Sequence, residues 1–447
     1  MSGRTSGRLI TQLAILSVMK LSHIIAAAGI GLLALLVVAC SSNQSYLSAV
    51  TMTPTVLTPR QDGQFDMARI SYRLLQAARI SIYLTNAAGQ SFPLRQGVAR
   101  TASPVPYELL FNGVSNGKLL PNGDYTWHVD AEGERGTQST SGALTISSTD
   151  VPFPKITELT LSTNTISPNR DAIDDHVYIN VVLAQKSKLN VFVVSQDGSR
   201  FEVQRVEGLM RMSAEGELEA GRYSYDYDGG IDLGADPPPD GRYTLLAQTE
   251  DRIGQTDTVT APLTITQSGR PVAEIVTQPD GRGVIWSAAG PKVVRSPNET
   301  DFITMGISET LYFTMAVRNV GMVPIRTGGP FDASDCYIME QNRYTKGYIQ
   351  EPGAFRIGVD YDTNPGPDHP WRWAVGTLKD LDIVDHNGTK LYYLAPGKQT
   401  VVSGCIKLTH VPARNPFSLY ASLIQEDVEI LPINYHVSPV LIQLVAP

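Results

Sequence analysis

The sequence is poor in the residues that catalytic and metal sites gather in clusters. It has only three cysteines and seven histidines in 447 residues, and no two histidines lie at metal-ligand spacing. It contains no zinc signature, nucleophile elbow or phosphate-binding glycine loop. We therefore expect no enzymatic activity, no metal and no cofactor. A carboxylate pair for polysaccharide hydrolysis leaves no linear trace in a β-sandwich, so that alternative stays open.

Long hydrophobic runs are scarce as well, with one exception near the N-terminus. Basic residues Arg4, Arg8 and Lys20 precede an apolar run at 24–39, which ends in Val-Val-Ala before Cys40. A helix that crosses a bilayer needs about 20 apolar residues, so this run is short for one. Its length and its small residue before the cysteine are typical of a signal peptide.

The leader resembles those of bacterial lipoproteins. The resemblance implies that residues 1–39 are removed and that Cys40, carrying a diacylglyceryl group, becomes the first residue. Two acyl chains hold a protein to a membrane stably, whereas one does so only marginally. Residues 40–50 are then the lipidated cysteine and a polar tether. The alternative is an uncleaved anchor helix that also uses residues 9–19.

Export outside the cytoplasm determines how charge and cysteines are interpreted. Removal of the leader changes the formal charge from −8 to −11, and an acidic surface argues against nucleic acid as a partner. Cys336 and Cys405 are then the only other cysteines, in a compartment that permits disulfides. We predict a bond between them, which would contribute roughly 4 kcal/mol on the chain-entropy model. Two unpaired buried thiols are the alternative.

An internal repeat organises the first half of the chain. Residues 57–63 and 166–172 align at an offset of 109, and the register holds to Gly89 and Gly198. Period-two alternation of apolar residues predicts half-buried antiparallel strands. The alternating residues are Ala68, Ile70, Tyr72, Leu74, Ile80, Ile82 and Leu84 in the first copy, and Val177, Ile179, Val181, Leu183, Leu189, Val191 and Val193 in the second.

The opening and closing turns of each copy resemble those of the Ig-like domain found in the flagellar hook-capping protein FlgD. Its pattern opens with Ser-Pro-Asn-Gly-Asp-Gly and closes with Pro-Asp-Gly-x-Tyr, as at 239–243. The resemblance implies Ig-like domains at 51–148 and 149–268. The predicted fold class is therefore all-β, with tandem Ig-like β-sandwiches after an N-terminal lipoprotein signal peptide. The module serves many roles, so it implies little about function.

The opening loop of the second copy contains three carboxylates that could form a calcium site. Asp171, Asp174 and Asp175 could offer oxygen ligands to calcium. However, Arg170 and Ala172 replace both glycines of the family pattern, and an arginine beside the loop opposes a cation. We expect these carboxylates to cap turn backbone instead.

Residues 269–447 have a different character and predict one larger β-sandwich with long loops. The segment 311–321 is similar to the strand that ends Val-x-Asn-x-Gly in adhesion-related domains of the CARDB type. Loops at 328–353 and 362–370 are longer than a minimal sandwich needs, and binding residues tend to lie in such loops.

Candidate binding residues in this region are aromatic and basic. Trp371, Arg372 and Trp373 lie beside the second loop, and Tyr344 lies in the first. Exposed aromatic rings stack on sugars and dominate interfaces. In strict alternation both tryptophans share one face and belong to the core, with Arg372 solvated on the other. The alternative, a binding platform, requires an exposed tryptophan.

These observations predict a lipid-anchored, extracytoplasmic scaffold or adhesin on a bacterial membrane or cell surface. Its partners would be the membrane, through Cys40, and envelope proteins or polysaccharide. The alternative is a carbohydrate-binding surface lipoprotein that uses aromatic residues of the C-terminal domain. A polysaccharide hydrolase is a third and weaker interpretation.

Overall fold

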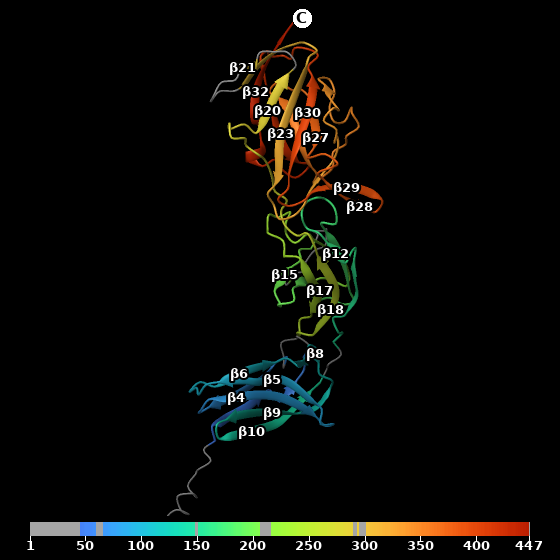
Figure 1. The fold of residues 1–447 in the computed structure, drawn as a ribbon. Helices are drawn as coiled ribbons and strands as arrows, with labels where there is room; N and C mark the ends of the chain where they lie inside the picture. The colour runs from blue at the N-terminus through green and yellow to red at the C-terminus, as the bar shows by residue number, and fades with distance from the viewer. Residues whose placement is uncertain are drawn as a thin grey trace, which may run out of the picture. The chain divides into compact units, whose positions relative to one another are not determined.

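The computed structural model of the protein describes residues 45–59, 66–147, 151–205, 216–288, 293–294 and 301–446. The predicted signal peptide and Cys40 lie outside this part of the chain. The described part is all-β, as predicted, with a single short 3-10 helix, η1 (Pro432–Asn434) (Figure 1). None of its segments is a helix with the length and apolar character that a membrane crossing requires.

The first module is a sandwich of two sheets. Three strands in the order β1-β3-β6 face five in the order β2-β10-β9-β4-β5, and β7 pairs with β8. Neighbouring strands β3 and β4 lie in different sheets, as in Ig-like sandwiches. The strands are β1 (Leu47–Thr53), β2 (Val56–Leu57), β3 (Ala68–Leu74), β4 (Ala78–Asn86), β5 (Ser91–Arg100), β6 (Tyr107–Phe111), β7 (Val114–Ser115), β8 (Lys118–Leu119), β9 (Gly123–Gly133) and β10 (Gly136–Ile146).

The second module repeats this topology. Its sheets run β11-β13-β16 and β12-β18-β17-β14-β15, so the repeat in the sequence is also a repeat of strand order. The strands are β11 (Ile156–Leu161), β12 (Thr165–Ile166), β13 (Val177–Leu183), β14 (Lys188–Val194), β15 (Arg200–Glu202), β16 (Gly221–Tyr227), β17 (Gly241–Glu250) and β18 (Thr256–Ile265).

Alternation explains both cores. In β3 and β4 the side chains Ile70, Tyr72, Ile80 and Ile82 have no exposed surface, and the residues between them are partly or fully exposed. Successive side chains of a strand point to opposite faces, so one face of each strand enters the core. The predicted tether overlaps the first strand, because β1 begins at Leu47.

A tyrosine hydrogen bond explains the closing turn of each copy. The Tyr125 hydroxyl donates to the Pro121 carbonyl at 2.8 Å, and the Tyr243 hydroxyl donates to the Pro239 carbonyl at 2.6 Å. Each bond returns to the backbone four residues upstream, as in the tyrosine corner of Ig-like domains. The Pro-x-Gly-x-Tyr spacing therefore places the ring in the core and its hydroxyl on the turn.

The C-terminal sandwich packs a five-stranded sheet, β19-β23-β30-β25 with β20 beside β23, against a nine-stranded sheet. The latter runs β21-β22-β32-β31-β26-β24-β29-β28, with β27 on β26. The strands are β19 (Ala273–Ile275), β20 (Val284–Ala288), β21 (Val293–Val294), β22 (Asp301–Gly306), β23 (Thr310–Asn319), β24 (Ile325–Thr327), β25 (Tyr337–Ile338), β26 (Phe355–Tyr361), β27 (Trp371–Ala374), β28 (Asp382–His386), β29 (Thr389–Leu394), β30 (Gln399–Lys407), β31 (Phe417–Gln425) and β32 (Val437–Val445).

The chain divides into two compact units. One comprises the residues up to 152 with Arg252–Gln255, and the other comprises Phe153–Asp251 and Thr256–Pro447. The second Ig-like module and the C-terminal sandwich therefore belong to one unit.

We predict that Tyr243→Phe lowers the free energy of unfolding by about 1 kcal/mol, because it removes one partly buried hydrogen bond and keeps the ring. Urea unfolding measures the loss. Tyr178→Phe is the control, since Tyr178 is 56% exposed. Equal losses in the two variants would contradict a structural role for the corner.

Candidate functional site

Three adjoining strands of the C-terminal sandwich are buried on both faces. β27 and β31 each pair with β26, and nearly all residues of the three strands are buried. Their inner face enters the hydrophobic core, which includes Trp371 and Trp373. The side chains of opposite parity form an outer face, whose buried polar residues are Arg356, Asp360, Arg372, Ser422 and, directly after β31, Glu426.

Three of the four predicted binding residues are buried. Trp371 is 0% exposed and Trp373 is 1% exposed, so the exposed tryptophan that a binding platform requires is lacking. The prediction that Arg372 is solvated is wrong, because this residue is 5% exposed. Alternation assigned it to the correct face, but it could not tell that a loop covers that face.

Buried ion pairs neutralise the outer face. Glu426 has no exposed surface. It contacts the Arg372 guanidinium directly, and its Oε1 lies 3.6 Å from Nη1 of Arg356. Glu351 accepts from Arg356 at 2.9 Å and from Arg326 at 3.2 Å. Removing one partner of such a pair leaves an uncompensated buried charge, which typically costs 3–5 kcal/mol.

Residues 341–353 form the loop that covers this face. The Glu351 amide donates to Glu426 Oε2 at 2.7 Å, and Arg356 Nη1 donates to the Ile349 carbonyl at 3.1 Å. The Arg343 side chain is buried under the loop, and its guanidinium lies 4.3 Å from the ring centre of Tyr344. Tyr344 is 51% exposed, so it is the one predicted binding residue that reaches solvent.

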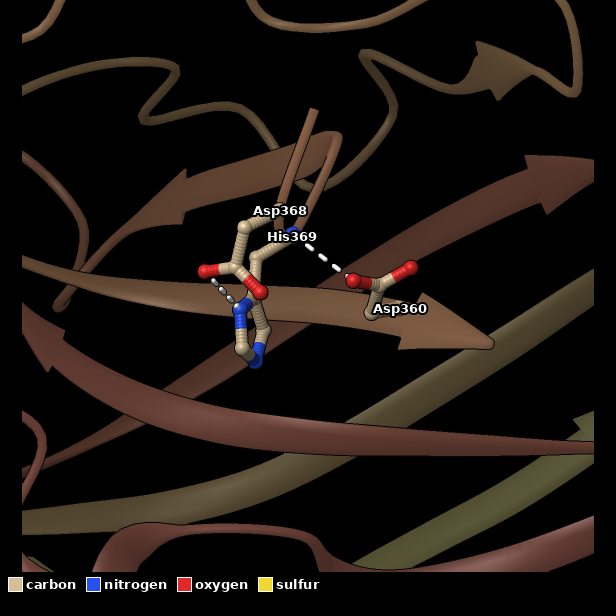
Figure 2. A group of neighbouring side chains, drawn as sticks. All are labelled: Asp360, Asp368 and His369. Carbon is tan, nitrogen blue, oxygen red and sulfur yellow. Dashed lines mark hydrogen bonds and ion pairs between the residues drawn. The ribbon is translucent and has the colours of Figure 1, made fainter. Parts of the chain in front are cut away.

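The side chains of a serine, a histidine and an aspartate form a hydrogen-bonded row on the outer face. His369 Nε2 is 2.9 Å from Ser422 Oγ, and His369 Nδ1 is 2.7 Å from Asp368 Oδ2. Figure 2 shows the Asp368 carboxylate against the imidazole. The spacing is that of a nucleophile, a base and an orienting acid. However, Ser422 is 0% exposed, and its oxygen also accepts the His436 amide at 3.2 Å. A substrate therefore has no access to this hydroxyl.

The same histidine belongs to a cluster with metal-ligand spacing. Potential ligand atoms of Asp360, Asp368 and His369 lie within 4.8 Å of one another (Figure 2). The Asp360 oxygens accept backbone N–H groups of Tyr361 and His369, each at 2.8 Å, and both ring nitrogens of His369 have partners. A metal would have to displace these bonds, so the cluster is better explained as an anchor for residues 362–370. Burial raises the pKa of Asp360.

The carboxylates of the second opening loop bind backbone. Asp175 accepts N–H groups of Asn169, Arg170 and Ala172 at 2.7–3.0 Å. Asp171 Oδ1 accepts the Ile173 amide at 2.8 Å. These oxygens cap the turn, as expected when a side chain replaces the missing hydrogen bonds of a loop.

Asp171 is nonetheless an unusual carboxylate. Its Oδ2 accepts the Tyr393 hydroxyl at 3.2 Å, and the residue is 3% exposed. Burial, followed by the charge of Asp175, raises the pKa of Asp171 to about 6. Its charged form therefore weakens the folded state.

The predicted disulfide is confirmed. Cys336 and Cys405 are bonded, with Cα atoms 4.6 Å apart and a sequence separation of 69. The bond joins β30 to the residue before β25, so it attaches the loop at 328–353 to the five-stranded sheet.

Sequence reasoning missed the residues that organise the outer face. His369 lies in the loop before β27, whereas Ser422 and Glu426 lie in and directly after β31, and the three form no motif. The available signal was the alternation of Arg356, Gly358 and Asp360 with the apolar residues of the same segment.

Comparisons with known proteins identify no family. No protein-family model and no curated protein matches the chain. Among solved structures it is similar to a tetra-tandem repeat from the extending region of a large adhesion protein, with 14% identity, 84% and 81% of the two chains covered and a TM-score of 0.16. It is also similar to a DUF4785 family protein from Legionella pneumophila, with 11% identity, 84% and 90% covered and a TM-score of 0.22. Such low scores support no functional argument.

We predict that Asp171→Asn stabilises the protein at neutral pH. The folded-state pKa of Asp171 lies above its usual value of 3.8. The wild-type carboxylate therefore destabilises the fold above pH 6, and this penalty disappears as the pH falls toward 4. Urea unfolding should give the variant an advantage of ~2 kcal/mol at pH 8 and little at pH 4.

Asp174→Asn is the control for this experiment, because Asp174 lies in the same loop and is exposed. A constant difference between Asp171→Asn and the wild type across this pH range would refute the assignment.

Proposed function

We propose that this protein is a lipid-anchored extracytoplasmic scaffold, in which two FlgD-type Ig-like modules carry a larger adhesion-related sandwich with features of the CARDB type. The membrane attachment is the diacylglyceryl group on Cys40, and the envelope partners are proteins or polysaccharide. The fold supports this role, because two of its three sandwiches repeat one simple topology.

The Cys336–Cys405 disulfide is the observation that carries the proposal. Disulfides persist in the periplasm and at cell surfaces and are rare in the reducing cytosol. The bond thus supports the export that the N-terminal leader independently indicates. An acidic chain with an oxidised cysteine pair fits an envelope protein better than a cytosolic or nucleic-acid-binding one.

A structural role also explains how the polar interior is used. The Ser422 hydroxyl is inaccessible, and the charges of Glu426 and Arg372 neutralise each other beneath a loop. These groups hold segments of backbone together. We therefore propose that the protein is not an enzyme.

The anchor is tested by Cys40→Ser in the full chain expressed in a bacterium. We expect the wild type in the membrane fraction with a modified N-terminal cysteine, identified by mass spectrometry. The variant loses the thioether and should leave the membrane fraction after the envelope is opened. Wild-type protein found in the cytosol with a free Cys40 thiol and an intact leader would refute the proposal.

Carbohydrate binding is the second candidate function, and exposed Tyr344 is the observation that favours it. Its ring stacks on a buried arginine, which would hold the ring in place for contact with a sugar face. The two tryptophans do not support this function, since both are buried.

We expect that Tyr344→Ala weakens retention of the protein on immobilised cell-wall polysaccharide at least about 10-fold, if the ring supplies a principal contact. Tyr312→Ala is the matched control, because Tyr312 is 45% exposed and lies on β23. Equal retention of both variants and the wild type would exclude Tyr344 as a sugar platform and leave the scaffold as the better explanation.

A further inference from the structure

The opening loop of the second Ig-like module is unusually well fixed by its own residues. Arg170, Ala172 and Asp174 all adopt positive φ, at 58°, 63° and 54°, which is uncommon for residues other than glycine. The Asp175 carboxylate holds this conformation through three backbone hydrogen bonds. As a result the loop is a compact turn.

The C-terminal sandwich supplies hydrogen-bond donors to this turn. Arg326 Nε, from β24, donates to the Asp171 carbonyl at 2.8 Å, and Gln425 Nε2, from β31, donates to the Arg170 carbonyl at 2.9 Å. The Tyr393 hydroxyl, from β29, donates to the Asp171 carboxylate at 3.2 Å. Three strands of the nine-stranded sheet thus contact two consecutive residues.

A glycine permits the close approach of the two backbones. A Cβ atom added to Gly353 would lie 2.5 Å from the Asp171 carbonyl carbon and 2.6 Å from the Arg170 carbonyl oxygen. Real Cβ atoms do not come so close, because these distances are well inside van der Waals contact. The surface therefore has the shape of the turn as well as matching donors.

Two residues of this surface are also held by contacts within the sandwich itself. Arg326 is also paired with Glu351, and the Gly353 amide donates to the Glu426 carbonyl at 2.7 Å. Such support reduces the conformational entropy lost when the surfaces join.

From these contacts we infer that residues 169–175 form a docking element, and that the surface made by Arg326, Gly353, Tyr393 and Gln425 is its intramolecular receptor. The receptor recognises two adjacent main-chain carbonyls and one carboxylate in a tight turn. The second module and the C-terminal sandwich then unfold as one cooperative body. This inference concerns the fold of the chain and does not depend on its anchoring or its ligand.

The receptor is tested by Gly353→Ala in the full chain, with Gly347→Ala as the matched control. Both glycines have positive φ, +79° and +81°, so alanine strains both backbones similarly. A Cβ at Gly347 meets nothing within 4 Å. By calorimetry we expect Gly353→Ala to split the unfolding of the second module from that of the sandwich, whereas Gly347→Ala keeps the wild-type transition.

A second measurement distinguishes undocking from local damage. The double variant Tyr393→Phe, Gln425→Ala removes donors without adding a clash. We expect the hydrogen-exchange protection of the Ile173 amide to fall roughly 10-fold or more in this variant and in Gly353→Ala. Tyr392→Phe is the control, because its ring packs on Phe331 instead.

Two results would overturn the inference. One is identical behaviour of Gly353→Ala and Gly347→Ala in calorimetry. The other is wild-type protection of Ile173 in the double variant, since that would mean that the donors do not hold the turn.

Discussion

The buried carboxylate of Glu426 imposes the constraint on which the C-terminal sandwich depends. A charge without solvent exposure must be paired and hydrogen-bonded, or the fold bears a penalty of several kcal/mol. Here Arg372 and Arg356 supply the positive charge, and the amide of Glu351 supplies a further donor. Glu351 lies in the covering loop, so neutralising Glu426 also holds that loop over the sheet. The same loop ends at Gly353, which lies against the backbone of Arg170 and Asp171 in the second Ig-like module.

The burial of the polar residues of the outer face also gives a structural explanation for the residues that resemble a catalytic site. Ser422, His369 and Asp368 have the spacing of a proton relay, and Asp360 adds a second carboxylate nearby. Their hydrogen bonds instead join the loop at 362–370 to β26 and β31. Hydrogen-bonded polar groups inside a fold fix the position of backbone, which suits a protein whose proposed task is to present a surface.

The two Ig-like modules reach the same topology by simpler means. Alternating apolar residues enter one core, and the hydroxyls of Tyr125 and Tyr243 hold the closing turns. The copies differ in the length of one edge strand, since β5 has 10 residues and β15 has 3, and in their loops. In the second copy, Arg170 and Ala172 stand where the FlgD-type pattern that it resembles has glycine. The Asp175 carboxylate holds both residues in the positive-φ conformation that glycine adopts readily.

The sequence by itself determined the alternating core strands of the two Ig-like modules, the repeat and the disulfide partners. Period-two alternation, turn residues and a cysteine pair are local or countable signals, and they located Ile70, Ile179 and the Cys336–Cys405 bond correctly. Only the tertiary structure decided which segments cover the two faces of each sheet in the C-terminal sandwich. Arg372 was assigned to the correct side of its strand, yet its burial depends on a loop about 20 residues away in sequence. The same holds for the contacts of His369 with Ser422 and of Arg372 with Glu426. They result from the pairing of β27 and β31 with β26, and one sequence without related sequences carries no record of those contacts.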